Sequence, residues 1–131
     1  MVIVDSSVWI DYLNRNLTPQ TRWLKANRGA ERIGLTTLVL AEVLQGIRYD
    51  SKFRAAEQFF RTLAIHEPLS LTVAIQAASN YRRLRARGIT IRNTVDCLIA
   101  TFCIENKIKL LHNRRDFEPF EQHLGLKVVH P

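Results

Sequence analysis

The stretch at residues 93–103, NTVDCLIATFC, constrains the fold of this chain most, because it predicts a helix that is apolar on nearly every side. Asn93 is a good N-cap, which places Asp96 in the first helical turn with Ile99 and Cys103 on the same face. A carboxylate over apolar surface costs free energy unless it is hydrogen-bonded, paired with a cation or bound to a metal. Asp96 is therefore either a first-turn acid that bonds backbone N–H groups and suits the helix dipole, or a functional group.

The length of 131 residues fits a single domain with a real core, and a hydrophobic share of 47% excludes long disordered segments. No apolar run approaches the roughly 18 residues of a membrane span, and the start lacks a signal-peptide pattern, so we expect a soluble cytoplasmic protein. Cys97 and Cys103 on one helix would be roughly 9 Å apart along its axis, too far for a disulfide. We expect both to be core residues in a reduced compartment, and no paired spacing predicts a zinc site.

The net charge of +7, from 19 Lys and Arg against 12 Asp and Glu, favours RNA, DNA or an acidic protein as partner. A solvated basic surface is the alternative. Four arginines stand at the end of a predicted helix, just before Gly88: Arg82, Arg83, Arg85 and Arg87. Basic side chains at a helix end suit its dipole, and the same cluster could contact phosphate near the start of the Asp96 helix.

Short apolar segments alternate with helical patterns along the chain. We expect strands at residues 1–5, 33–35, 64–66, 109–112 and 127–130. We expect helices from Val8, from Thr18 to about Asn27, from Thr36 to Ile47, at 51–63, from Ser70 to Leu84 and at 93–103. This alternation predicts an α/β fold, a three-layer α/β/α sandwich with a mainly parallel sheet.

Four acids stand out against this pattern: Asp5, Glu42, Asp96 and Asp116. Asp5 and Asp116 follow strands, and the carboxyl ends of parallel strands meet at the ligand-binding edge of a sheet. Clustered carboxylates repel one another, and a divalent cation removes that repulsion. Oxygen ligands without Cys or paired His favour Mg²⁺, with Mn²⁺ as a substitute. As structural alternatives, Asp5 and Asp116 could be N-caps and Glu42 a helix-surface residue.

An acidic pocket in a basic protein fits metal-assisted hydrolysis of a phosphodiester, because the metal binds the carboxylates while the arginines attract phosphate. No Ser–His–Asp or Cys–His set is required. His112 lies near the expected site but is predicted to be a packing residue at the end of its strand.

Four segments also carry a family resemblance. They are VIVDSSVWID at 2–11, LAEVLQG at 40–46, YRRLRARG at 81–88 with NTVDCLIA at 93–100, and LLHNRRDFE at 110–118. In this order the set resembles PIN-domain nucleases, and among them the VapC toxins of bacterial toxin–antitoxin pairs. The resemblance covers nearly the whole chain and implies a single PIN-like nuclease domain at 1–131.

The resemblance further implies an Mg²⁺-dependent endoribonuclease that cleaves structured RNA, often tRNA, and is silenced by a cognate VapB-type antitoxin. Asp5 and Asp96 match the principal metal ligands of the family, and Glu42 matches the second acid. The family also implies a homodimer, with the aromatic helix at 51–63 among the candidates for dimer or antitoxin contacts.

The fourth motif departs from the family, because many relatives have an acid where this chain has Arg114. Asp116 or a neutral oxygen of Asn113 could substitute, so one metal rather than two could be bound before RNA arrives. We expect Arg114 and Arg115 to join the helix-end arginines as RNA contacts, and Ser6 to belong to the site.

Two other classes of function fit part of the sequence. An apolar strand that ends in Asp also opens phosphoacceptor receiver domains, but Ser6 and Ser7 stand where a receiver would have a second acid. A non-catalytic nucleic-acid-binding module would explain the positive charge. It would not explain why four acids stand in apolar contexts, where they cost stability.

Overall fold

The structure, a computed structural model, describes residues 1–131. Its four strands are β1 (Val2–Val4), β2 (Ile33–Thr36), β3 (Ala64–His66) and β4 (Lys109–Leu111). Its helices are α1 (Ser6–Leu13), α2 (Pro19–Asn27), α3 (Thr37–Gln45), α4 (Asp50–Arg61), α5 (Leu71–Ala86), α6 (Thr94–Glu105), the 3₁₀-helix η1 (Arg115–Phe117) and α7 (Glu118–Leu124).

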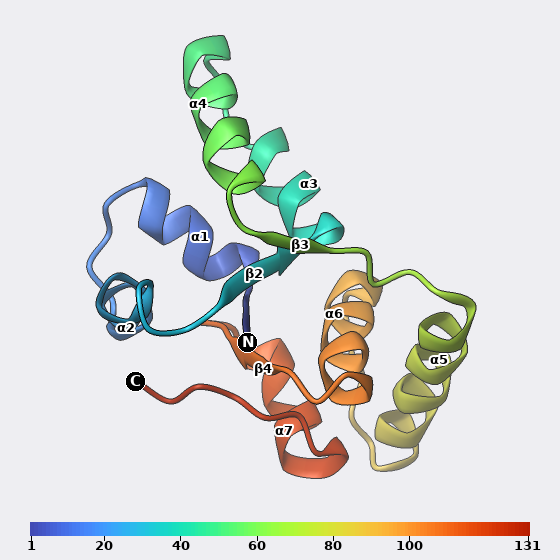
Figure 1. The fold of residues 1–131 in the computed structure, drawn as a ribbon. Helices are drawn as coiled ribbons and strands as arrows, with labels where there is room; N and C mark the ends of the chain where they lie inside the picture. Colours follow the sequence, from blue (N-terminus) through green and yellow to red (C-terminus); the bar gives the residue numbers. More distant parts are fainter.

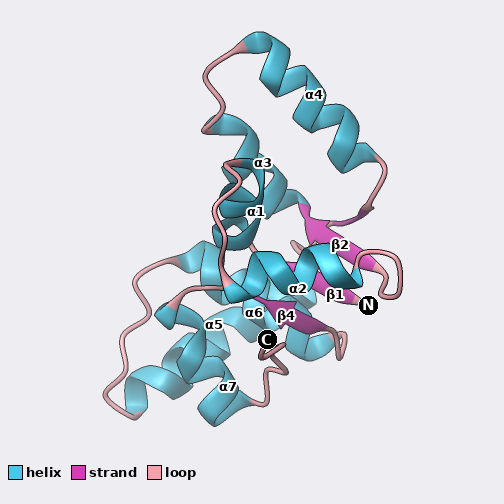
Figure 2. Cartoon of the chain, turned by 90° about the vertical axis from the view of Figure 1, so that its left-hand side faces the viewer, coloured by secondary structure: helices cyan, strands magenta, loops and turns pink.

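The four strands form one parallel sheet in the order β3-β2-β1-β4. Helices α1 and α2 lie on one side of the sheet and α5 and α6 on the other (Figure 1). Helices α3 and α4 form a hairpin that projects beyond the sheet, as both views show (Figures 1 and 2). The predicted α/β class, with helices on both faces of a parallel sheet, is confirmed.

The sheet is short and is buried at its centre, because β1 lies between two neighbours and all three of its residues are buried, whereas the edge strand β3 is partly exposed. Several helices begin at a residue whose polar side chain caps the first turn. The side chains of Thr18, Thr36, Ser70 and Asn93 each accept a backbone N–H in the first turn of the helix that follows. These caps explain why helix starts could be located from the sequence.

Helix α6 is the most buried helix, and its buried residues cover more than one face, as its apolar sequence predicts. The two cysteines are free and buried, as expected for core residues. Burial raises the pKa of the Cys103 thiol to about 12, so this thiol stays protonated and unreactive at neutral pH. Asn80 on α5 donates to Thr101 on α6 (3.0 Å), which satisfies both buried side chains.

The chain after β4 differs from the prediction in two ways. Residues 127–130 do not form a strand, because only two backbone hydrogen bonds join them to β4: the Leu110 N–H donates to the Lys127 carbonyl (2.9 Å), and the Val129 N–H donates to the Leu110 carbonyl (3.0 Å). The pairing is thus a single bridge between Val128 and Leu110. Helix α7 was not predicted. Its signals were Pro119 in the first turn and Gly125, which ends the helix with φ +80°.

No helix of the structure combines the length and the apolar character that crossing a membrane requires.

We expect Gly34→Ala to lower the free energy of unfolding by about 1–3 kcal/mol, because a Cβ on this buried strand residue would lie 2.6 Å from the backbone oxygen of Ala64. Urea denaturation measures the change. Gly29→Ala is the matched control, since a Cβ there has nothing within 4 Å. Equal stability of the two variants would contradict the close packing of β2 on β3.

Candidate active site

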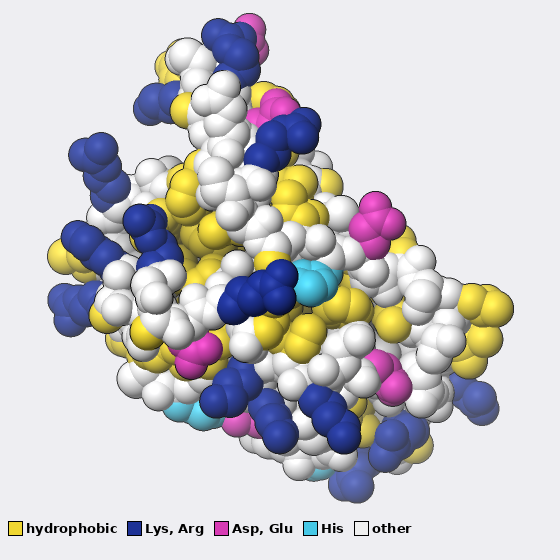
Figure 3. All heavy atoms as spheres, in the orientation of Figure 1, with side chains coloured by type: hydrophobic (Ala, Val, Ile, Leu, Met, Phe, Trp, Pro, Cys, Tyr) yellow, Lys and Arg dark blue, Asp and Glu magenta, His cyan; other side chains and the backbone are white.

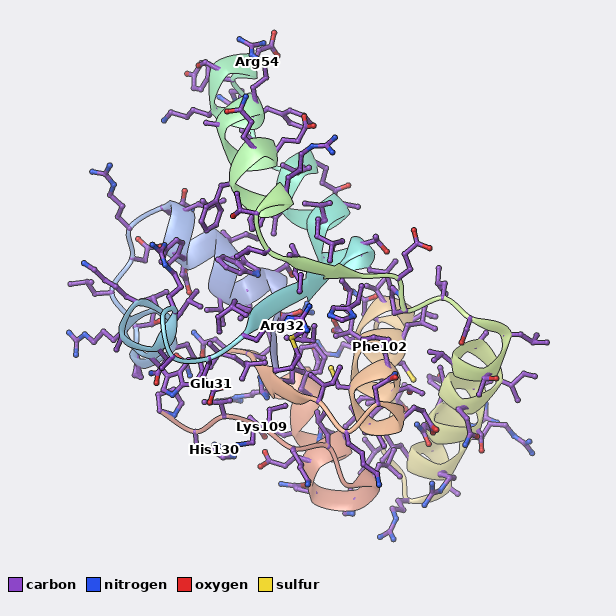
Figure 4. The ribbon with its side chains drawn as sticks, in the orientation of Figure 1. Glu31, Arg32, Arg54, Phe102, Lys109 and His130 are labelled. Atoms are coloured by element: carbon purple, nitrogen blue, oxygen red, sulfur yellow. The ribbon has the colours of Figure 1, made fainter.

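The site follows from the strand order. The chain adds β2 and β3 on one side of β1 and then returns to place β4 on the other, so the carboxyl ends of β1 and β4 form the topological switch point of the sheet. Asp5 follows β1, and the segment that contains Arg114 and Asp116 follows β4. Lys109 and Arg32, labelled in Figure 4, lie at the amino ends of β4 and β2, which is the opposite end of the sheet from the site.

Asp5 is fully buried and serves the fold with one of its two carboxylate oxygens. Its Oδ2 accepts hydrogen bonds from the backbone N–H of Ser7 (3.1 Å) and from the Ser7 hydroxyl (2.7 Å), so Asp5 is the N-cap of α1. Its Oδ1 is buried without a hydrogen-bond partner. The N-cap alternative is therefore correct, and it leaves one oxygen free for another role.

Ser7 is a residue of this site that sequence reasoning missed. Its hydroxyl also accepts the backbone N–H of Asn113 (3.1 Å), which ties the segment after β4 to the start of α1. The available signal was a small hydroxyl residue two positions after a capping Asp. The Asn113 side chain is exposed and makes no hydrogen bond, so its predicted role as a neutral oxygen ligand stays a prediction.

Asp96 is fully buried and is paired with Arg114 rather than with backbone N–H groups. Arg114 Nη1 donates to Asp96 Oδ1 (3.1 Å), and Nη2 lies 2.9 Å from Asp96 Oδ2, an ion-pair distance without hydrogen-bond geometry. Arg114 Nη2 also donates to Asp116 Oδ2 (3.1 Å). The guanidinium, which was expected to contact RNA, thus lies between two of the predicted acids.

Asp116 lies inside η1, where no side chain caps the helix, so the alternative that made it an N-cap is wrong. Arg115 beside it is exposed and forms no ion pair. His112 is partly buried and packs against the ring of Phe117, as predicted for a packing residue. Burial lowers the pKa of His112, which keeps its ring neutral at pH 7.

Glu42 approaches the same acids from α3. Its side chain is half-buried, and its Oε1 is buried without a hydrogen-bond partner, so it is not a plain surface residue. Burial raises the pKa of Glu42 and the Asp5 carboxylate raises it further, while Arg114 and the nearby Ser6 side chain lower it. Glu42, Ser6 and Asp5 therefore belong to one electrostatic neighbourhood.

Burial is also the main cause that raises the pKa of Asp96, to about 7 from an ordinary 3.8. Arg114 opposes this shift, whereas Asp5, Asp116 and Glu42 add to it. Burial lowers the pKa of Arg114, but the carboxylates of Asp96, Asp5 and Asp116 outweigh this effect and raise it, so the guanidinium is charged. All four predicted acids thus influence the titration of Asp96 or Arg114.

The donor set fits a hard divalent cation. Asp5, Glu42 and Asp96 each present a buried carboxylate oxygen that lacks a hydrogen-bond partner, and oxygen ligands are those that Mg²⁺ and Mn²⁺ prefer. The acids are not drawn together as a ready ligand cage, since no group of three Asp, Glu, His or Cys side chains is close enough to hold a metal ion as it lies. Arg114 supplies the neutralising charge instead.

Two arginines of the predicted cluster lie where α5 packs on α6. Two hydrogen bonds, Gln76 to Glu105 and Asn80 to Thr101, show that the helices pack antiparallel, so the end of α5 lies beside the start of α6. Arg82 and Arg85 line a hollow of about 610 Å³ there together with Thr94. All four arginines of the cluster are exposed, and none pairs with an acid of the site.

On the face drawn in Figure 3, Lys and Arg side chains are scattered rather than gathered in one patch. The aromatic helix α4 packs inward through Phe59 and Phe60, both of which contact the Trp9 ring. Tyr49 and Phe53 remain exposed on this hairpin, whose far end is marked by Arg54 in Figure 4. Phe60 is therefore a core residue and Phe59 packs against the core, and the predicted role of this helix in dimer or antitoxin contacts stays a prediction.

Comparison with known families gives a match of residues 2–121 to the model described as PIN domain. The chain belongs to the PIN-domain family. This confirms the resemblance found in the four motifs and decides against a receiver domain. Ribonuclease VapC11 of Mycobacterium tuberculosis and a VapC ribonuclease of Mycobacterium bovis are each 29% identical to this PIN domain over 135 residues, with 98% of both chains covered.

Solved structures share the PIN fold over the same length. VapBC2 from Rickettsia felis bound to a promoter DNA fragment has a TM-score of 0.78 at 19% identity, with 98% of each chain covered. VapBC-1 from nontypeable Haemophilus influenzae has a TM-score of 0.76 at 19% identity, with 98% of this chain and 97% of that chain covered. At this identity the likeness establishes the fold.

We expect the stability of the metal-free protein to depend on pH through Asp96. Because its pKa is raised on folding, the folded state holds the proton more tightly, and this stabilisation is present below about pH 4 and lost as the pH rises through about 7. Asp96→Asn, which mimics the neutral acid, should match the wild type near pH 4 and be more stable above pH 7. Urea denaturation in EDTA across this range tests the expectation, and parallel pH profiles would contradict it.

Proposed function

We propose that this PIN domain is an Mg²⁺-dependent endoribonuclease toxin that hydrolyses phosphodiester bonds of structured RNA, with tRNA as the substrate class. The observation that supports the proposal most is the electrostatic coupling of three acids, Asp5, Glu42 and Asp96, each of which has a buried carboxylate oxygen without a hydrogen-bond partner. Asp5 and Asp96 are fully buried and Glu42 is half-buried. Buried carboxylates cost stability, so a protein retains them where they have a function.

In this proposal Asp5 and Asp96 hold the metal directly, and Glu42 supports the metal or the attacking water. Asp116, at the outer side of Arg114, is a further ligand candidate. A divalent cation held by these carboxylates would activate a water for attack and would offset the negative charge that develops on the phosphate. The chain itself supplies the fixed positions: Ser7 orients Asp5, and Ser6 lies beside Glu42.

The substrate and partner classes rest on charge and on the relatives. A net charge of +7 favours a polyanion, and the relatives that align over the full length of the chain are named ribonucleases. The similar solved structures are VapBC complexes, which supports a VapB-type antitoxin as the partner that silences this chain. We further propose a single domain at 1–131, a homodimer and a cytoplasmic location.

We expect Asp5→Asn and Asp96→Asn each to reduce RNA cleavage by about 10²–10³-fold, because each removes one charged ligand of the cation. Glu42→Gln should reduce it less. The assay is cleavage of total tRNA by the purified, partner-free protein with Mg²⁺ or with EDTA. Glu105→Gln, an exposed acid at the other end of the same helix as Asp96, is the matched control and should cleave like the wild type.

Discrete fragments that need both Mg²⁺ and Asp96 would establish the nuclease. Full activity of Asp5→Asn or Asp96→Asn in a folded protein would contradict the proposed set of metal ligands. A second candidate function, binding of nucleic acid without cleavage, is favoured by one observation, the pairing of Arg114 with Asp96. It predicts tight RNA binding with no metal-dependent fragments.

The arginine cluster at the end of α5 should bind phosphate. Replacing Arg82 and Arg85 together by Gln should weaken RNA binding and flatten its salt dependence, by about 0.7–0.9 in log–log slope for each phosphate that the variant no longer neutralises. Binding to catalytically inactive Asp96→Asn protein between low and high salt measures the slope. Replacing Arg54 and Arg61 on α4 is the charge-matched control. An unchanged slope in the Arg82/Arg85 variant would mean that these side chains serve only the helix end.

A further inference from the structure

We propose that Arg114 is a built-in competitor of the metal: its guanidinium and the divalent cation neutralise the same Asp96 carboxylate, so metal binding must displace the Arg114 side chain. This inference rests on the proposed metal site. It assigns Arg114 a role in setting metal affinity, which is different from the RNA contact expected from the sequence.

The contacts of Arg114 support the first step. Its two terminal nitrogens face both oxygens of Asp96, at 3.1 and 2.9 Å, and one of them also reaches Asp116 at 3.1 Å. This fork covers the carboxylate that the proposed site needs most, since Asp96 is fully buried and its Oδ2 has no hydrogen-bond partner. A guanidinium and a dication cannot both lie against one carboxylate without strong mutual repulsion.

The surroundings of Arg114 allow the displacement. The side chain is 28% exposed, and it follows the exposed Asn113, so it can turn into solvent. The backbone beneath it is fixed: the N–H of Asn113 donates to Ser7 Oγ, and the N–H of Arg114 donates to His112 Nδ1. Displacement of Arg114 therefore requires rotation of its side chain and no rearrangement of the sheet.

The backbone that carries the acids is also fixed. Asp5 is held by Ser7 as the N-cap of α1, and Asp96 lies in the first turn of α6. No three acids lie close enough to hold a metal ion as they stand, so metal binding requires their side chains to close around the cation as Arg114 leaves Asp96. The energetic consequence is that the metal affinity of this chain is lower than that of a variant without the guanidinium, by the free energy of the ion pair.

The test is Mn²⁺ binding to the partner-free protein without RNA, followed by the electron paramagnetic resonance signal of free Mn²⁺. Arg114→Met keeps an unbranched stem and removes the charge, and it should bind Mn²⁺ at least about tenfold more tightly, equivalent to about 1.4 kcal/mol. Arg114→Gln should change the affinity in the same direction, and it keeps the test decisive if the Met variant misfolds. Asp96→Asn should weaken binding in either background.

Arg115→Met is the matched control, because it removes one positive charge from the next residue, which is exposed and forms no ion pair. Its Mn²⁺ affinity should stay within about twofold of the wild type, since exposed charges are largely screened. An Mn²⁺ affinity that is unchanged in Arg114→Met and Arg114→Gln, or raised equally by Arg115→Met, would overturn the inference.

The binding measurement separates this inference from the proposed nuclease function. Tighter Mn²⁺ binding by Arg114→Met in a protein that cleaves no RNA would support the competition and refute the nuclease. Metal-dependent RNA cleavage with equal Mn²⁺ affinity of wild type and Arg114→Met would support the nuclease and refute the competition.

Discussion

The hydrogen bonds around Asp5 are the constraint on which the rest of the candidate site depends. The backbone N–H of Asp5 donates to the Leu111 carbonyl (2.9 Å), which locks the ends of β1 and β4 together. Its carboxylate caps α1 through Ser7, and the Ser7 hydroxyl holds the backbone of Asn113. One buried side chain therefore fixes the first helix and the segment that presents Arg114. The oxygen that remains free points to a second use, because the fold needs only the other one.

The electrostatics of the site reduce to how the Asp96 carboxylate is neutralised. Burial raises its pKa to about 7, so a proton is one solution at neutral pH, and the Arg114 guanidinium is another. A divalent cation is the third in the proposed function, and it would also relieve the repulsion among Asp5, Glu42 and Asp96. The proton, the guanidinium and the divalent cation compete for the same Asp96 oxygens. Which of them is bound therefore depends on pH, on the metal concentration and on how easily the Arg114 side chain rotates away.

The sequence allowed prediction of features that depend on a few neighbouring residues. Asp5 after an apolar strand and Asn93 before an apolar helix are local signals, and both placements are confirmed. The pairing of Arg114 with Asp96 joins residues 18 positions apart and depends on the direction of the chain after β4, which no local pattern encodes. The strand expected at 127–130 is wrong for a related reason, because the number of backbone hydrogen bonds that this segment makes to β4 is not encoded in its own apolar pattern.

Helix α6 connects the acidic and basic parts of the proposed function. Its first turn contributes Asp96 to the buried acids, while Thr94 and Leu98 line the outer hollow with Arg82 and Arg85. Asp96 and the α6 residues that line the hollow with the arginines therefore belong to the same end of one helix. A polyanion held by the arginines would therefore come close to carboxylates that repel it. Its approach to the acids is favourable only when a cation neutralises them, which makes the neutralisation of Asp96 the step that couples binding to chemistry.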